Sequence, residues 1–294
     1  MFHFIKLRKI WYIISIAVII PGIISLFMQG LNLGIDFTGG TIMEVRFDKA
    51  MEAQDVRKAV DSVGLEGSKS IQQSGDRNYL IRTRALDQEE SDKLFKGMQD
   101  KLGKATLLRT DLVGPVMGKE LAYKALLALF IASVLMVIYI TIRFEFKQGI
   151  AAIIALLHDT LLVTGIFSLL QIEVDTAFVA AILTIIGYSI NDTIVIFDRI
   201  RENLRMRKKG ESLEELVNRS IWQTLARSIN TVLTVMFVLL AMYFLGGSTI
   251  KTFMLAMLIG VASGAYSSIF NASPLWVDLK LLETRKRVQS AKAS

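Results

Sequence analysis

Six long apolar runs constrain this chain of 294 residues more than any other feature of its sequence. A helix that crosses a bilayer needs about 20 consecutive, mostly apolar residues. The six runs that meet this requirement cover residues 10–28, 121–142, 149–170, 176–197, 229–245 and 252–270. Within lipid, backbone polar groups must be satisfied inside the segment, so each run is predicted to be helical. The sequence therefore predicts an α-helical membrane protein with six transmembrane helices.

Residue composition excludes several classes of function. The chain has no cysteine and only two histidines, His3 and His158, so disulfides, zinc–thiolate sites, iron–sulfur clusters and multi-histidine metal sites are not expected. Residues 114–120 resemble a phosphate-binding loop, but the spacing is wrong and Glu120 stands where Ser or Thr is required. We therefore expect no enzyme activity, no cofactor and no metal, and any work done by the chain would be coupled to an ion gradient.

Basic residues gather in every second connection of the predicted helices: before the first, between the second and third, between the fourth and fifth, and after the sixth. They are Lys6, Arg8, Lys9, Arg143, Lys147, Arg199, Arg201, Arg205, Arg207, Lys208, Lys209, Arg219, Arg227, Lys280, Arg285, Lys286, Arg287 and Lys292. Because each helix crosses the membrane once, these regions all fall on one side. The positive-inside rule then places both termini in the cytoplasm. The net charge of +7 thus indicates a multi-pass protein of the cytoplasmic membrane rather than nucleic-acid binding.

These boundaries divide the chain into four parts. Residues 1–29 are expected to form a cytoplasmic tail and an uncleaved first span, and residues 120–275 the remaining five helices. A basic cytoplasmic loop is expected at 198–227 and a cytoplasmic tail at 276–294. The basic loop either sets the topology or also contacts anionic membrane lipid or a ribosome.

The block 30–119 is too polar to cross the membrane and is expected to form a small extracytoplasmic domain. Alternation of apolar residues predicts strands and helical spacing predicts helices. In chain order these are strand 41–47, helix 53–63, strands 71–73 and 79–83, helix 88–102 and strand 105–112. The order βαββαβ is typical of a ferredoxin-like α+β unit.

Several polar residues interrupt the predicted spans. Placing an Asp at the centre of a spanning helix costs about 2.5–3.5 kcal/mol, so such a residue needs a partner, a wet cavity or a proton. At 1.5 Å per residue, Asp159 lies about 15 Å and Asp192 about 10 Å from the cytoplasmic side. Arg227 begins the fifth span near that side, so the three residues are expected to share one polar layer.

This layer has two interpretations. Asp192, Arg227 and Asp159 are candidates for a proton relay. Burial raises the pKa of a carboxyl group and a nearby Arg lowers it, so the environment sets when such a group changes its charge. Alternatively, they belong to a hydrogen-bonded cluster that holds the helices together. The supporting polar residues are Asn191, Thr193, His158 and Asn230, and His158 is expected to pack or hydrogen-bond rather than to titrate.

A glycine-rich segment follows the first span. Gly39 and Gly40 permit positive φ and close backbone approach, and Asp36 lies just before them. The segment is interpreted either as a tight turn between span and domain or as a site where Asp36 caps a helix or meets a cation.

Three stretches together resemble one family. They are GIDFTGGT at 34–41, GYSINDTIVIFDRIREN at 187–203 and GVASGAYSSIF at 260–270. In this order, within a six-span chain bearing one outward domain, they resemble the SecF family of bacterial protein-export membrane proteins. The second stretch is the most specific of the three, and the similarity covers nearly the whole chain.

The resemblance implies a function and partners. SecF proteins belong to the resistance-nodulation-division type and pair with SecD. They associate with the SecYEG channel and YajC, and use the proton-motive force to assist late translocation of a preprotein. It further implies that Asp192 is the relay residue, that Arg227 is the basic residue at the start of span five, and that Asp36 belongs to the glycine motif.

Other functions are also compatible with the sequence. The chain could be a membrane scaffold that stabilises SecD without titrating, or a proton-driven small-molecule exporter of the same superfamily. The outward block of about 90 residues is small for an exporter. An intramembrane aspartyl protease using Asp159 and Asp192 is disfavoured, because neither residue lies in a Tyr-Asp or Gly-x-Gly-Asp context.

Overall fold

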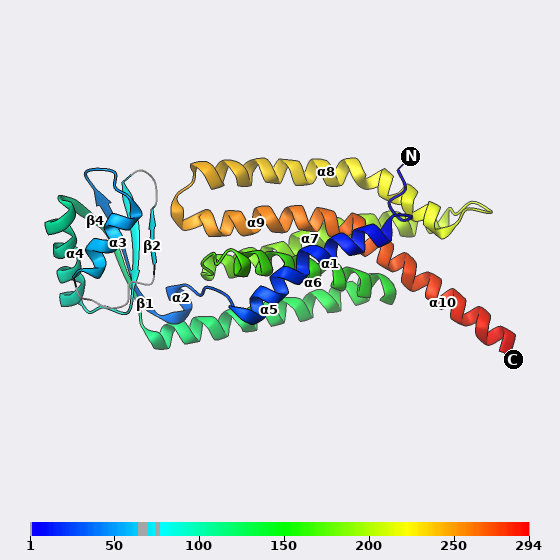
Figure 1. The fold of residues 1–294 in the computed structure, drawn as a ribbon. Helices are drawn as coiled ribbons and strands as arrows, with labels where there is room; N and C mark the ends of the chain where they lie inside the picture. The colour runs from blue at the N-terminus through cyan, green and yellow to red at the C-terminus, as the bar shows by residue number, and fades with distance from the viewer. Residues whose placement is uncertain (1, 64–69, 74–76, 294) are drawn as a thin grey trace.

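The structure is a computed structural model that describes residues 2–63, 70–73 and 77–293. A long helical bundle carries a small sheet domain at one end, and both chain termini lie at the opposite end (Figure 1). The elements in chain order are α1 Arg8–Met28, α2 Ile35–Thr38, β1 Gly40–Phe47, α3 Ala53–Asp61, β2 Ser70–Gln73, β3 Asn78–Thr83, α4 Gln88–Leu102, β4 Ala105–Val113, α5 Pro115–Arg143, α6 Phe146–Leu169, α7 Thr176–Arg205, α8 Leu213–Leu245, α9 Ser248–Ser267, the π-helical turn η1 Ser268–Ala272 and α10 Ser273–Ala293.

Six helical segments of the described chain are long and apolar enough to cross a membrane. They are Arg8–Met28, Val116–Arg143, Phe146–Leu169, Thr176–Arg205, Leu213–Leu245 and Ile250–Thr284, with mean hydropathies of 1.7 to 2.7. The prediction of a six-helix membrane protein is confirmed. The last segment is one continuous helical path that joins α9, η1 and α10.

Two helices extend well beyond the apolar runs. Helix α7 continues to Arg205 and α8 begins at Leu213, so most of the stretch 198–227, expected as a loop, is helical. Helix α8 begins there because Ser212 accepts from the Glu215 backbone N–H while the Glu215 carboxylate accepts from the Ser212 N–H. Apolar periodicity alone placed the helix start too late, since this end of α8 is rich in charged residues.

The region expected as a C-terminal tail is also helical. Helix α10 follows η1 directly, and its Trp276 is fully buried in the bundle. Arg8 of α1 pairs with Asp278 of α10 at 2.8 Å and with Glu214 of α8 at 2.9 Å. These contacts hold the ends of three helices together on the side of the molecule where the termini lie.

The sheet domain contains one antiparallel sheet with strand order β2-β3-β1-β4. Met43 of the central strand β1 lies opposite Ile81 of β3 and Thr110 of β4. Helices α3 and α4 follow β1 and β3, which confirms the predicted βαββαβ order. Helix α4 begins at the capping box of Asp87 and Glu90. The core of the domain consists of Met43, Val45, Phe47, Val56, Val60, Tyr79, Ile81, Leu86, Leu94 and Met98.

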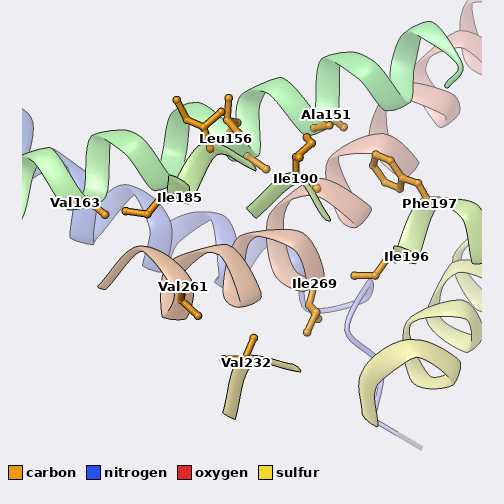
Figure 2. Close-up of a cluster of buried hydrophobic side chains, with 14 of the residues drawn as sticks. Ala151, Leu156, Val163, Ile185, Ile190, Ile196, Phe197, Val232, Val261 and Ile269 are labelled. Atoms are coloured by element: carbon orange, nitrogen blue, oxygen red, sulfur yellow. The ribbon is translucent and has the colours of Figure 1, made fainter. Parts of the chain in front are cut away.

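The bundle has its own apolar core, part of which is seen in Figure 2 between α6, α7, α8 and α9. Small residues let the helices approach closely. A Cβ on Gly22 of α1 would lie 2.7 Å from Gly165 Cα of α6, and one on Gly260 of α9 would lie 2.3 Å from Ile185 Cδ1 of α7. Close packing of this kind is a principal means by which membrane helices associate.

Candidate functional site

Asp159 of α6 is at the centre of a hydrogen-bonded cluster in the middle of the bundle. Its side chain is 1% exposed. Its Oδ1 accepts a 2.5 Å hydrogen bond from Ser263 Oγ, and its Oδ2 accepts from Ser189 Oγ at 2.6 Å and Ser267 Oγ at 2.7 Å. His158 Nδ1 lies 3.0 Å from Oδ1. An ionised carboxylate only accepts hydrogen bonds, so three hydroxyl donors suit it well. The cluster ties α6 to α7 and α9.

Ser189 lies within the polar run of the fourth predicted span, but sequence reasoning linked none of the three serines to Asp159. Ser263 and Ser267 are four residues apart on α9, so they lie on one helix face, and Ser189 lies on the facing side of α7. The sequence contained this signal in the small-residue stretch 260–270, which is usually read as helix packing alone.

Asp192 lies one turn after Ser189 on α7 and has a different environment. Its side chain is 5% exposed, yet its Oδ2 has no hydrogen-bond partner among the residues that the structure describes. A buried acceptor without a partner costs about 1–3 kcal/mol, and more when it is charged. Arg227 of α8 is the charged group that acts on Asp192 electrostatically, but the pair is not among the ion pairs within 4.0 Å found in the described chain. Oδ2 of Asp192 is therefore an unsatisfied acceptor within the described residues.

The other polar residues expected near Asp192 lie on both sides of it. Thr193 points into the bundle, where its Oγ1 lies 2.8 Å from Ser268 Oγ of η1. Asn191, Arg227 and Asn230 are exposed on the outer surface of α7 and α8. The structure therefore brings Asp192 and Thr193 inside and places the two Asn side chains and Arg227 on a surface that no described part of this chain covers.

His158 is buried beside the Asp159 cluster. Its ring stacks on Tyr266 of α9 with centroids 6.0 Å apart, while its Nε2 has no hydrogen-bond partner in the described part of the chain. Stacking on Tyr266 and the contact with Asp159 account for the position of the ring.

The glycine-rich segment joins the end of α1 to the sheet domain. Gly39 has φ 72° and Gly40 has φ 150°, values that suit glycine, and β1 begins at Gly40. The Asp36 carboxylate accepts hydrogen bonds from the Thr176 backbone N–H at 2.9 Å and from Thr176 Oγ1 at 2.7 Å. Asp36 thus binds the first turn of α7, whose N-cap residue is Asp175, and a negative charge there is favoured by the helix dipole.

Among the described residues, no group of three or more His, Asp or Glu is placed to hold a metal ion. The clustered oxygens around Asp159 are explained by hydrogen bonds between protein groups.

Comparison with known proteins agrees with this architecture. Residues 92–282 match the family described as "Protein export membrane protein SecD/SecF, C-terminal", and residues 24–51 match the "SecD/SecF GG Motif". The chain belongs to the SecD/SecF family. The first match includes Asp159, Asp192 and Arg227, and the second includes the segment from Asp36 to Gly40.

Among relatives in the SecD/SecF family, the chain is 42% identical to the protein translocase subunit SecF of Thermobaculum terrenum over the full length of both. It is 43% identical to the protein translocase subunit SecDF of Bacillus subtilis, covering 96% of this chain and 39% of that protein. The crystal structure of SecDF, a translocon-associated membrane protein from Thermus thermophilus, matches with a TM-score of 0.87 at 37% identity, covering 95% of this chain and 38% of that one. The chain thus spans about two fifths of the SecDF proteins that it matches.

Proposed function

We propose that this chain is a SecF-type accessory subunit of the Sec protein translocase. It works with a SecD partner to couple the proton-motive force to late-stage translocation of a preprotein. Asp192 takes up and releases the proton, and the positive charge of Arg227 favours the ionised form of Asp192. Asp159 anchors the surrounding helices. Asn191 and Asn230 line the approach to the relay, while Thr193 and His158 hold the helices beside it.

The contrast between the two buried acids carries this proposal. Asp159 has four neighbouring polar groups on its two oxygens, so adding a proton there would disrupt hydrogen bonds that already satisfy it. Asp192 is buried, and its Oδ2 has no partner among the described residues, so a proton there removes a charge from low dielectric without breaking a hydrogen bond seen in the structure. Buried groups that change charge at low cost are typical of proton pathways in membrane proteins.

The exposed polar surface of α7 and α8 supports a membrane partner at the same place. Asn191, Asn230 and Arg227 are polar groups on candidate spans, and leaving them in lipid is costly. The SecDF relatives are longer proteins, and this chain spans about two fifths of their length. We infer that a separate SecD subunit covers this surface and completes the environment of Asp192.

The remaining placement follows from charge and from this function. Both termini and the basic ends of α7 and α8 lie in the cytoplasm, and the sheet domain lies outside the cytoplasmic membrane, where it meets the emerging preprotein. SecYEG and YajC complete the assembly, and anionic lipid contacts the basic end of the bundle.

The test is preprotein export into inverted membrane vesicles that contain SecYEG, SecD and this chain, measured with and without a proton gradient. Asp192→Asn keeps the shape of the side chain and removes its titration. Its expected effect is loss of the gradient-dependent stimulation, with assembly and gradient-independent export retained. Asp198→Asn is the matched control, because Asp198 lies on the same helix and pairs at the surface with Arg143.

Two results would overturn the proposal. If Asp192→Asn retains the gradient-dependent stimulation of export seen in wild type, Asp192 has no part in the mechanism, and the chain is better explained as a scaffold for SecD. Failure of Asp192→Asn to assemble, while Asp198→Asn assembles, would assign Asp192 to helix packing.

A further inference from the structure

The loop between α6 and α7, residues 170–175, is fastened to the segment that leaves α1. Gly34 N–H donates to the Val174 carbonyl at 2.8 Å, and Val174 N–H donates to the Asn32 carbonyl at 2.8 Å. The approach is close, because a Cβ on Gly34 would lie 2.8 Å from Glu173 Oε1. The two segments therefore meet through their backbones, as neighbouring strands do.

Two polar side-chain contacts extend this junction. Asp36 accepts two hydrogen bonds from Thr176, the first residue of α7. Arg82, in strand β3 of the sheet, pairs with Glu173 of the α6–α7 loop, with Nε and Oε1 2.8 Å apart. The two side chains are only 14% and 20% exposed, so solvent screens this pair less than a surface ion pair.

The Arg82–Glu173 pair lies in a charged cleft between the sheet and the bundle. A cavity of about 380 Å³ is located there, and its lining includes Asp36, Glu44, Arg109, Asp111 and Asp175 as well as the pair itself. Acidic groups outnumber basic ones in this lining. Arg109 is paired with Asp111 within β4 at 2.5 Å, so the cation that reaches across to the loop is Arg82.

These contacts connect the relay helix to the sheet domain by a short path. Thr176 is the first residue of α7, and Asp192 lies sixteen residues later on the same unbroken helix, about 24 Å along its axis. Asp36 is separated from the start of β1 by only a few residues. These contacts give a displacement of α7 a direct route to β1 through Asp36 and to β3 through Glu173 and Arg82, in addition to the covalent connection of β4 to α5.

We propose that Asp36, Arg82 and Glu173 are positioning residues that transmit movement between helix α7 and the sheet domain. This inference rests on the proposed function, because it assigns the route by which a proton at Asp192 affects the domain that meets the preprotein. Two polar attachments at separate points prevent the domain from pivoting freely on the end of α7. Interfaces with discrete contacts pass on small shifts as rigid-body rotations.

Charge reversal tests the route in the same vesicles that contain SecYEG, SecD and this chain. Arg82→Glu and Glu173→Arg each place like charges together and are expected to reduce the gradient-dependent stimulation about five-fold or more. The double variant restores an ion pair in swapped order and should recover at least half of the stimulation. Arg109→Glu is the matched control. It reverses a charge in the same cleft, but Arg109 pairs with Asp111 inside the sheet domain and not with the α6–α7 loop.

The result that overturns the inference is a double variant no better than either single variant, or single variants that behave as wild type. If a single variant fails to assemble, the double variant must restore assembly and stimulation together, and assembly alone counts against the route. Asp192→Asn, measured in parallel, distinguishes failure of the route from failure of the proposed function. Loss of stimulation in Asp192→Asn but not in the charge reversals leaves the proposed function standing and rejects the route alone. Wild-type stimulation in Asp192→Asn rejects both.

Discussion

Ser189 Oγ donates a 2.6 Å hydrogen bond to Asp159 Oδ2, and this bond joins α7 to α6 one helical turn before Asp192. Helix α7 thus supplies a donor to the buried Asp159. It also carries Asp192, whose Oδ2 has no hydrogen-bond partner within the described ranges of the chain. Because the two acids differ in hydrogen bonding rather than in depth of burial, they are expected to respond differently to the same substitution.

The Asp159 cluster is expected to stabilise the folded bundle. Ser263→Ala removes one donor to the carboxylate, and hydrogen bonds to charged groups contribute about 1.5–3 kcal/mol. Asp159→Asn should cost at least as much, because an amide has a single acceptor oxygen for three hydroxyl donors. Thermal unfolding of the purified chain in detergent measures both changes.

Thr184→Ala is the control for the serine substitution. Thr184 is exposed on α7 and donates to the Ala180 carbonyl of its own helix, so its removal should change the free energy of unfolding by about 0.5 kcal/mol or less. Equal Tm values for Ser263→Ala and Thr184→Ala would contradict the anchoring role of the cluster.

The crossing of α1 and α6 at Gly22 and Gly165 is expected to tolerate no side chain. A Cβ on Gly22 would lie 2.7 Å from the Gly165 Cα, and this contact is with backbone, so the helices must separate. Gly22→Ala should lower the free energy of unfolding by about 1–3 kcal/mol, the usual cost of overpacking. The same melting experiment measures it.

Gly187 offers a matched position on α7, because a Cβ there would meet nothing within 4 Å. Gly187→Ala should leave the stability of the isolated chain unchanged or raise it by up to about 1 kcal/mol through better helix propensity. A Gly22→Ala variant as stable as Gly187→Ala would show that the close approach of α1 and α6 is not required.

Burial raises the pKa of Glu173 above its ordinary value of 4.5, against the opposing effect of Arg82, and the nearby Asp175 and Asp36 raise it further. A raised pKa means that the folded chain binds this proton more tightly than the unfolded chain. The stabilisation from protonated Glu173 is therefore fully present below the unfolded pKa and is lost as pH rises through the folded pKa.

Glu173→Gln removes this titration, so the Tm of wild type relative to Glu173→Gln should increase as pH falls from neutral toward 4.5. Subtracting the Tm of Glu173→Gln from that of wild type cancels the contributions of the other carboxyl groups, which both proteins share. A difference that stays constant, or that decreases on acidification, would contradict the environment assigned to Glu173.

Much of the fold could be predicted because its signals are local. Runs of apolar residues identified six spans, and alternation with turns identified the βαββαβ order of the sheet domain. The ends of the helices were less accessible. Helix α8 begins at a capping box in a charged stretch, and α10 continues through a π-helical turn beyond the apolar run, so hydropathy placed both boundaries too close to the membrane.

The candidate site could be predicted only in part. Asp159 and Asp192 are conspicuous because acids are costly in a spanning helix, and the sequence identified both. It did not indicate that three serines from two other helices converge on Asp159, nor that Asn191 and Asn230 face outward. Those facts depend on how the helices rotate against one another, which a pattern within one helix does not determine.

The central claim is that Asp192, and not Asp159, changes its protonation. Infrared difference spectroscopy of the assembled complex, recorded between acidic and alkaline pH, detects the carbonyl band of a carboxyl group that gains a proton. Other carboxyl groups titrate over the same range, so the spectrum of each variant is subtracted from that of wild type. A carbonyl band is expected in the subtraction of Asp192→Asn and no such band in the subtraction of a folded Asp159→Asn variant. A band in the subtraction of Asp159→Asn and none in that of Asp192→Asn would contradict the account.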